Sequence, residues 1–171
     1  FSGCMVGNQM DTTCTSITTA TTVFAYSLGI SDLTGIQYFD NLADLICPNN
    51  NLTSLPNLPA TLTQLACYNN AITSLPTLPP NLQSLSAQFN LLTALPVLPV
   101  TLTYLNCSSN NLGSLPPSLP PTLDQLQCSS CNLSTLPLLP NTLTQLHAYS
   151  NNLTSLPPVS YTHLTLPTNR E

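Results

Sequence analysis

Residues 51–59 read Asn-Leu-Thr-Ser-Leu-Pro-Asn-Leu-Pro, and this phrase returns along the chain. Its first leucine, Leu52, has counterparts at Ile72, Leu92, Leu112, Leu133 and Leu153. The steps between these positions are 20, 20, 20, 21 and 20 residues. A fixed period of this length is typical of a solenoid, in which each coil buries its apolar face against its neighbours. The role of a residue is therefore set by its place in the coil.

A second pattern, L-x-x-L-x-C-x-x-N-x-L, precedes each phrase. It is first seen from Leu42 to Leu52, and six units match it at nearly every apolar place over residues 42–157. The pattern resembles the leucine-rich repeat consensus, which accepts Asn or Cys at the ninth place. The alternation of Leu and polar residues predicts a short strand in each coil, stacked on the next as a parallel sheet at about 4.8 Å. This sheet is expected to line the concave face of a leucine-rich repeat solenoid.

The return side of each coil reads Leu-Pro-x-Leu-Pro, as in residues 75–79. About nine residues remain there, and two are prolines that lack an amide hydrogen. Extended, polyproline-II-like backbone fits this segment, whereas a helix does not. The sequence therefore predicts a thin convex side, little helix and a β-rich architecture. The motif is similar to that of the short bacterial class of leucine-rich repeats.

The chain divides into three parts. Residues 1–29 lack the phrase and are expected to form an N-terminal cap, as the ends of a solenoid require. Residues 30–157 are expected to form the solenoid, with one imperfect coil beginning at residues 30–33 and six regular ones. Residues 158–171 break the register. Residues 159–168 resemble a translated transposase-type sequencing adapter, because GTC TCT TAT ACA CAT CTG ACG CTG CCG ACG encodes them residue for residue. The tail is therefore interpreted as non-native, and the natural protein is expected to continue.

The ninth place of the coil predicts a ladder of side chains inside the turn. Each Asn can bond backbone groups that the bend leaves unpaired, at about 1 kcal/mol per bond. The ladder residues are Asn50, Asn70, Asn90, Asn110, Cys131 and Asn151.

Seven cysteines suggest a disulfide scaffold only if their spacing is ignored. Cys47, Cys67, Cys107 and Cys128 share one core place and are expected to be free, buried thiols. Cys128 and Cys131 form a C-x-x-C pair, but the repeat register explains both residues, and no further zinc ligands lie near. Cys4 and Cys14 lie outside the repeats and are a candidate disulfide, which would indicate an oxidising compartment. No metal site and no cofactor are expected.

The concave face is where leucine-rich repeats usually bind, and its outward positions are neutral, rich in amides and hydroxyls, and include a few aromatics. An ordinary soluble sheet face is the alternative interpretation. The candidate ligand-binding residues are Ile46, Gln64, Tyr68, Gln88, Phe89, Tyr104, Asn106, Gln127, Gln145, His147 and Tyr149.

Charge limits the partners. Only 4% of the residues are charged, and Arg170 is the sole basic one apart from two histidines. Nucleic acid and anionic membrane surfaces need Lys or Arg, so neither is expected as a partner. No apolar run approaches a membrane span. Catalysis is not expected either, because Asp44 and His147 lie about five coils apart, roughly 24 Å at the strand spacing. The oligomeric state does not follow from the sequence.

The wording of residues 4–14 and 30–42 resembles secreted leucine-rich repeat proteins of Bacteroidetes-type bacteria. This resemblance implies an extracellular or cell-surface binding or adhesion module with a protein or glycan ligand. The Leu-Pro-x-Leu-Pro repeats also resemble those of injected, host-directed effectors, in which a helical hairpin would precede the repeats. A passive spacer for a missing domain is the third alternative. An isolated enzyme is the least favoured of these interpretations.

Overall fold

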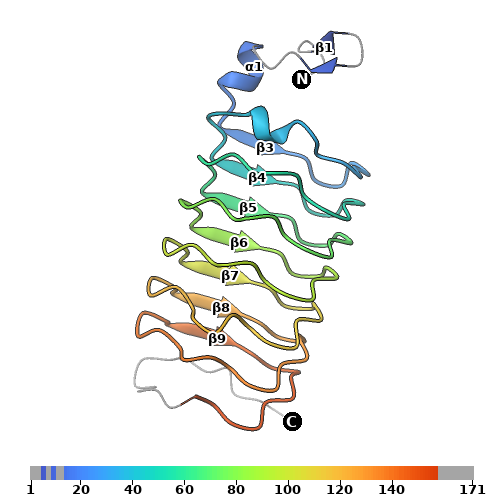
Figure 1. Ribbon diagram of the computed structural model, residues 1–171. Helices are drawn as coiled ribbons and strands as arrows, with labels where there is room; N and C mark the ends of the chain where they lie inside the picture. Colours follow the sequence, from blue (N-terminus) through green and yellow to red (C-terminus); the bar gives the residue numbers. More distant parts are fainter. Residues whose placement is uncertain (1–4, 7–8, 11–13, 158–171) are drawn as a thin grey trace.

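The computed structural model describes residues 5–6, 9–10 and 14–157, and only the backbone of the first two pairs. Residues 22–157 form a stack of coils, one above the other (Figure 1). Cys4 and the predicted adapter-derived tail lie outside the described residues. So does part of the predicted cap.

One parallel sheet organises the stack. Its seven strands are β3 (Thr22–Phe24), β4 (Asp44–Ile46), β5 (Gln64–Ala66), β6 (Ser84–Ser86), β7 (Tyr104–Asn106), β8 (Gln125–Gln127) and β9 (Gln145–His147). They are hydrogen-bonded in chain order, with each strand paired to the next. The remaining elements are β1 (Met5–Val6), β2 (Gln9–Met10), the four-residue helix α1 (Thr15–Thr18) and a 3-10 helix at Ile36–Tyr38. The fold class predicted from the sequence, a parallel-sheet solenoid with little helix, is confirmed.

Leucine spacing explains the register. The central residue of every strand from β4 to β9 is a leucine that is buried, and it pairs with the central leucine of the next strand, as Leu65 does with Leu85. The flanking strand residues point to the opposite side, because side chains alternate along a strand. Each coil therefore adds another leucine to one continuous core.

The sheet begins earlier than the sequence indicates. β3 pairs in parallel with β4, with Val23 opposite Leu45, so the strand of the first coil lies within residues 1–29, which the sequence assigns to the cap. Residues 22–25 lack the consensus leucines, yet β-branched and aromatic side chains suit a strand. Ala25 is buried at the place that Cys47 takes one coil later.

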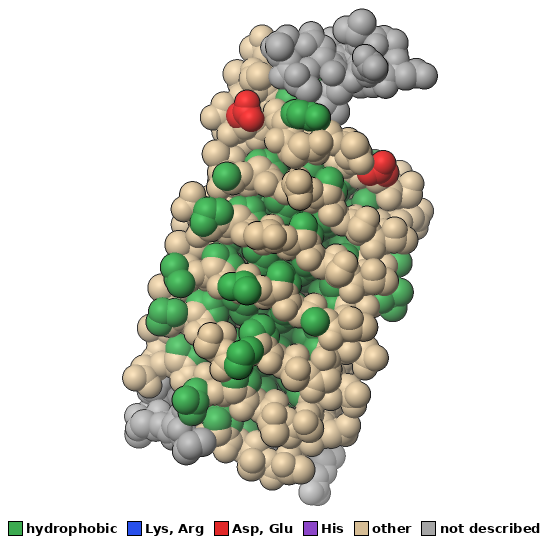
Figure 2. Space-filling model, in the orientation of Figure 1, with side chains coloured by type: hydrophobic (Ala, Val, Ile, Leu, Met, Phe, Trp, Pro, Cys, Tyr) green, Lys and Arg blue, Asp and Glu red, His purple; other side chains and the backbone are tan. Residues whose placement is uncertain are grey.

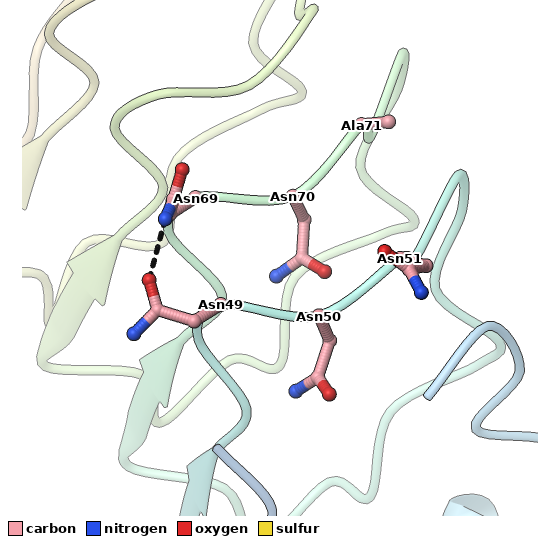
Figure 3. Close-up of a pocket in the computed structure, with 6 residues that line it drawn as sticks. All are labelled: Asn49, Asn50, Asn51, Asn69, Asn70 and Ala71. Carbon is pink, nitrogen blue, oxygen red and sulfur yellow. Dashed lines mark hydrogen bonds between the residues drawn. The ribbon is translucent and has the colours of Figure 1, made fainter. Parts of the chain in front are cut away.

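The asparagine ladder forms inside the turn that follows each strand. The Nδ2 of Asn70 donates to the carbonyl oxygens of Cys47 and Cys67 at 3.1 and 3.0 Å, and its Oδ1 accepts the Leu52 amide at 3.0 Å. Asn90, Asn110 and Asn151 repeat this arrangement in their own coils. Each amide thus joins one coil to the coil before it. Figure 3 shows the Asn50 and Asn70 side chains lying parallel, one above the other.

Cys131 takes an asparagine's place in this ladder. Its thiol donates to the carbonyl oxygen of Cys107 at 3.2 Å, the contact that Asn110 makes with Ala87 at 3.0 Å. The core thiols of Cys47, Cys67, Cys107 and Cys128 are free and fully buried, as expected from their shared place in the coil. Burial raises the pKa of Cys47 and of Cys128 to about 12, so both thiols stay neutral near neutral pH.

The return segments that follow β4 to β9 are extended and contain no helix within the described residues, whereas that of the first coil contains the 3-10 helix Ile36–Tyr38. The second leucine of the motif points inward, as Leu78 and Leu98 show. Val97, at the variable place of the same motif, points outward and is 89% exposed. The one longer step, of 21 residues, comes from an extra proline in residues 115–120. There Ser118 makes an isolated parallel bridge to Leu138.

Candidate functional site

The sheet face is the outward surface of β4–β9 together with the two residues that follow each buried core place. Every strand contributes its first and third residues to this surface, since the second is turned into the core. The face therefore carries equivalent positions in parallel columns, spaced by one strand. This regularity brings together side chains that lie about 20 residues apart in the chain.

The sheet face presents most of the residues expected from the sequence. Gln64, Phe89, Gln145 and Tyr149 are exposed. Ile46, Tyr68, Gln88, Tyr104, Gln127 and His147 are half-buried by their neighbours on the sheet. Ten of the eleven expected residues therefore offer surface to a ligand.

Asn106 is the exception. It is 8% exposed, and its Nδ2 donates to the Oε1 of Gln127 at 2.8 Å while its Oδ1 accepts the Ser108 amide at 3.1 Å. Its side chain thus braces β7 against β8, and a role of Asn106 in ligand contact stays a prediction. The alternation of side chains along a strand predicts that Asn106 points outward, but it does not predict the bond to Gln127 on the next strand.

A row of residues in the left-handed conformation runs along the ends of the strands. Its members are Ser27, Asn49, Asn69, Phe89, Ser109, Ser130 and Ser150, with φ between 54° and 57°. The backbone ladder continues through them, since the amide of each one before Ser150 donates to a carbonyl of the next coil, as Asn69 does to Gln88 at 3.0 Å. Asn tolerates this conformation better than other residues with a side chain, whereas a bulky aromatic is an outlier. Phe89 is thus the unusual member.

Two open pockets lie beside this row. One, of about 420 Å³, is lined by Asn49, Asn50, Asn51, Asn69, Asn70 and Ala71. Figure 3 shows Asn49 and Asn69 projecting from the ends of two neighbouring strands, joined by a hydrogen bond from Nδ2 of Asn69 to Oδ1 of Asn49 at 2.5 Å. The second pocket, of about 340 Å³, is lined by Asn49, Tyr68, Asn69, Gln88 and Phe89. The two pockets share Asn49 and Asn69, so they are adjacent.

Sequence reasoning missed a threonine ladder at the start of the strands. The hydroxyls of Thr61, Thr101, Thr122 and Thr142 donate to the carbonyl oxygens of Leu42, Leu82, Leu102 and Leu123 at 2.8–2.9 Å. The sequence feature that could have indicated this ladder is a threonine directly before the first leucine of the repeat, which occurs in four units. These bonds tie each coil to the preceding one on the side opposite the asparagines.

The chemistry of the sheet face is that of amides, hydroxyls and aromatic rings. The described residues contain no Lys or Arg, and Figure 2 shows acidic side chains on the visible surface only near the N-terminal end of the stack. No group of three or more His, Cys, Asp or Glu side chains that could hold a metal ion occurs within residues 14–157. In that same range the helices are too short to cross a bilayer. The face therefore suits neutral ligands.

Comparison with solved structures matches this geometry. The chain superimposes on the leucine-rich repeat domain of a Shigella effector with a TM-score of 0.75 and 34% identity, covering 81% of this chain and 62% of that one. The chain is a leucine-rich repeat solenoid. The repeats also match YopM, a leucine-rich effector protein of Yersinia pestis, with a TM-score of 0.67 and 34% identity over 69% of this chain. A leucine-rich repeat protein of Leptospira interrogans shares the fold at 21% identity and a TM-score of 0.51, covering 75% of this chain and 48% of that one.

The leucine-rich repeat chain spans 34% of the length of the Yersinia pestis YopM structure and 62% of the Shigella domain. No protein-family model and no curated protein matches the sequence. The shared feature is thus the repeat solenoid.

Proposed function

We propose that this leucine-rich repeat chain is a non-catalytic binding module, outside the cell or at its surface, that presents the sheet face to a protein or glycan ligand. The carrying observation is the sheet face itself: six strands offer a surface rich in partly exposed Tyr and Gln side chains, on which Asp44 is the one acidic strand residue of β4–β9. Aromatic residues are enriched at binding surfaces, whereas Lys, Glu and Asp are depleted.

Within residues 14–157, the distance between the acid and base groups on the sheet face favours a binding role over a catalytic one. Asp44 lies on β4 and His147 on β9, five strand steps apart, which is about 24 Å at the spacing of a parallel sheet. A general base must lie within about 3 Å of the proton that it abstracts. These two groups therefore cannot act on the same substrate atom.

Cys14 supports the location outside the cell. It is disulfide-bonded, whereas the five core cysteines are free. Disulfides of this kind form and persist in oxidising compartments. Cys4, the partner expected from the sequence, lies outside the described residues, so their pairing stays a prediction. Its test is mass spectrometry of the unreduced protein, in which a linked pair of peptides containing Cys4 and Cys14 is expected.

A host-directed effector domain is the second candidate. The likeness to YopM, a leucine-rich effector, and to the Shigella effector domain favours it. The disulfide at Cys14 argues against it, because such bonds persist in an oxidising environment.

A combined protein and glycan array tests the binding role. The wild type is compared with a Tyr104→Ala/Tyr149→Ala variant on the sheet face and with a Val97→Ser/Val100→Ser variant on the return side. Tyr149, Val97 and Val100 are exposed and Tyr104 is half-buried at the surface, so neither double change should unfold the stack. We expect a ligand that the first variant loses and the second retains. An array on which both variants bind as the wild type does would contradict the assignment of the sheet face.

A further inference from the structure

Phe89 occupies a place where the coil otherwise uses Asn or Ser. We propose that Phe89, Tyr68, Gln88, Asn49 and Asn69 form a subsite for a neutral saccharide at the ends of β4, β5 and β6. The proposal rests on the binding role given above and names the ligand class for one part of the sheet face. Three observations carry it: the conformation of Phe89, the recess beside it, and an unpaired acceptor on Gln88.

The conformation of Phe89 works against stability. Its φ is 55°, in the left-handed region that bulky residues rarely adopt. The ring gains little from burial in return, because Phe89 is 57% exposed. Asn69 and Ser109 hold the same backbone place in the neighbouring coils with side chains that suit it better. A strained, exposed aromatic is the kind of outlier from which a functional role is inferred.

The recess beside the ring has the dimensions of a small ligand. Its volume is about 340 Å³, at the lower end of the usual range for ligand pockets, and it is adjacent to the 420 Å³ recess, with which it shares Asn49 and Asn69. The aromatic rings of Phe89 and Tyr68 and the amides of Gln88, Asn49 and Asn69 line it. A linear chain of sugar units could extend from one recess to the other.

Gln88 supplies the third observation. Its Oε1 is buried and has no hydrogen-bond partner within the described residues. Buried polar atoms of native proteins are nearly always paired, so an unpaired one calls for a partner from outside the chain. Because this oxygen is buried, the hydroxyl of a ligand in the recess would donate to it only after the Gln88 side chain turns toward the recess. The bond between Asn69 and Asn49 leaves the Nδ2 of Asn49 and the Oδ1 of Asn69 available as well.

The combination of groups indicates the ligand class. A primary amide both donates and accepts, which matches a hydroxyl group, since that also does both. A sugar ring adds an apolar face of C–H groups that can lie flat on an aromatic side chain. No charged residue lines the recess, so an anionic or cationic ligand would find no counterion there. Together these groups favour a neutral saccharide over a charged peptide.

The test uses four neutral probes, maltohexaose, cellohexaose, mannohexaose and xylohexaose, titrated into the full chain by isothermal titration calorimetry. Phe89→Asn installs the residue of the neighbouring coil and relieves the backbone strain. We expect one probe to bind the wild type and the variant to bind it at least about tenfold more weakly. The variant's melting temperature should equal or exceed that of the wild type. Weakened binding in a protein of undiminished stability separates ligand contact from a structural role.

Val97→Ser is the matched control, because Val97 is an exposed apolar residue on the return side. It should leave saccharide binding unchanged. The proposal is overturned if no probe binds the wild type at about 10 mM, a concentration that would reveal even millimolar affinity. It is also overturned if Phe89→Asn binds as the wild type does. If the array instead yields a ligand that the Tyr104/Tyr149 variant loses while no saccharide binds, the binding role stands and only the saccharide subsite falls.

Discussion

Asn110→Ala should destabilise the solenoid far more than the same change at its neighbour Asn111. The Asn110 side chain is buried, and its Nδ2 donates to the carbonyl oxygens of Ala87 at 3.0 Å and Cys107 at 2.9 Å. Its Oδ1 accepts the amide of Leu92 at 2.9 Å. The change removes these three bonds and a longer one from Nδ2 to the Ser108 carbonyl oxygen at 3.3 Å. It also leaves the Leu92 amide without its acceptor.

The magnitude follows from what each partner keeps. Asn90 still donates to the Ala87 carbonyl and Cys131 to that of Cys107, so each carbonyl loses one bond worth about 1 kcal/mol. The Leu92 amide loses its side-chain acceptor, which costs roughly 1–3 kcal/mol for a buried donor. The sum is about 3–5 kcal/mol before relaxation and water entry, and we expect about 3 kcal/mol, or roughly a 150-fold change in the unfolding equilibrium.

Urea unfolding followed by circular dichroism measures this loss as a difference in the free energy of unfolding. The control, Asn111→Ala, changes an exposed side chain and keeps the backbone bond from residue 111 to Leu92 at 3.0 Å. It should cost less than about 0.5 kcal/mol. A loss below about 1 kcal/mol for Asn110→Ala, or equal losses for both variants, would refute the view that the ladder stabilises the stack.

Three further predictions concern the core. Iodoacetamide should modify none of the five free thiols in the native protein and all five in denaturant, as mass spectrometry would show; native labelling would mean that the coils open. The free energy of unfolding should fall as pH rises from about 9 to about 12. In this range Cys47 and Cys128 stay protonated in the folded protein, whereas the same thiols ionise in the unfolded chain. That slope, up to about 1.4 kcal/mol per pH unit for each thiol, should flatten in a Cys47→Ala/Cys128→Ala variant. Leu105→Ala should cost about 2–5 kcal/mol in urea unfolding, since Leu105 is fully buried, and exposed Val97→Ala less than about 0.5; similar losses would argue against a continuous core.

Most of the solenoid follows from the sequence because its information repeats. Each coil places a leucine at the centre of a strand, and six matching units fix the register of all but the first strand pair. The same repetition locates the ladder of Asn70, Asn90 and Asn110 and the buried cysteine row. A single coil would not have sufficed, because short apolar runs suit helices and strands alike.

The features that the sequence left open are those without repetition. β3 lacks the leucines of the other strands, so its place in the sheet was not apparent from the pattern. Asn106 occupies an outward position, yet its bond to Gln127 buries it. The left-handed conformation of Phe89 depends on the turn that Asn69 and Ser109 also make, and no residue type at that place signals it. Such contacts depend on which residues the neighbouring coils place beside a side chain, and the repeat pattern does not specify those residues.

The distance between two spin labels tests most directly whether successive coils superimpose. Cysteines introduced at Gln64 on β5 and Gln145 on β9 are exposed, whereas the native core thiols are buried. Four strand steps separate the two strands, so their Cα atoms should lie about 19 Å apart. A pulsed electron–electron double resonance measurement should give a narrow distance distribution near this value, widened only by the label side chains. A broad distribution, or one centred beyond about 30 Å, would contradict a stack of coils at the spacing of a parallel sheet.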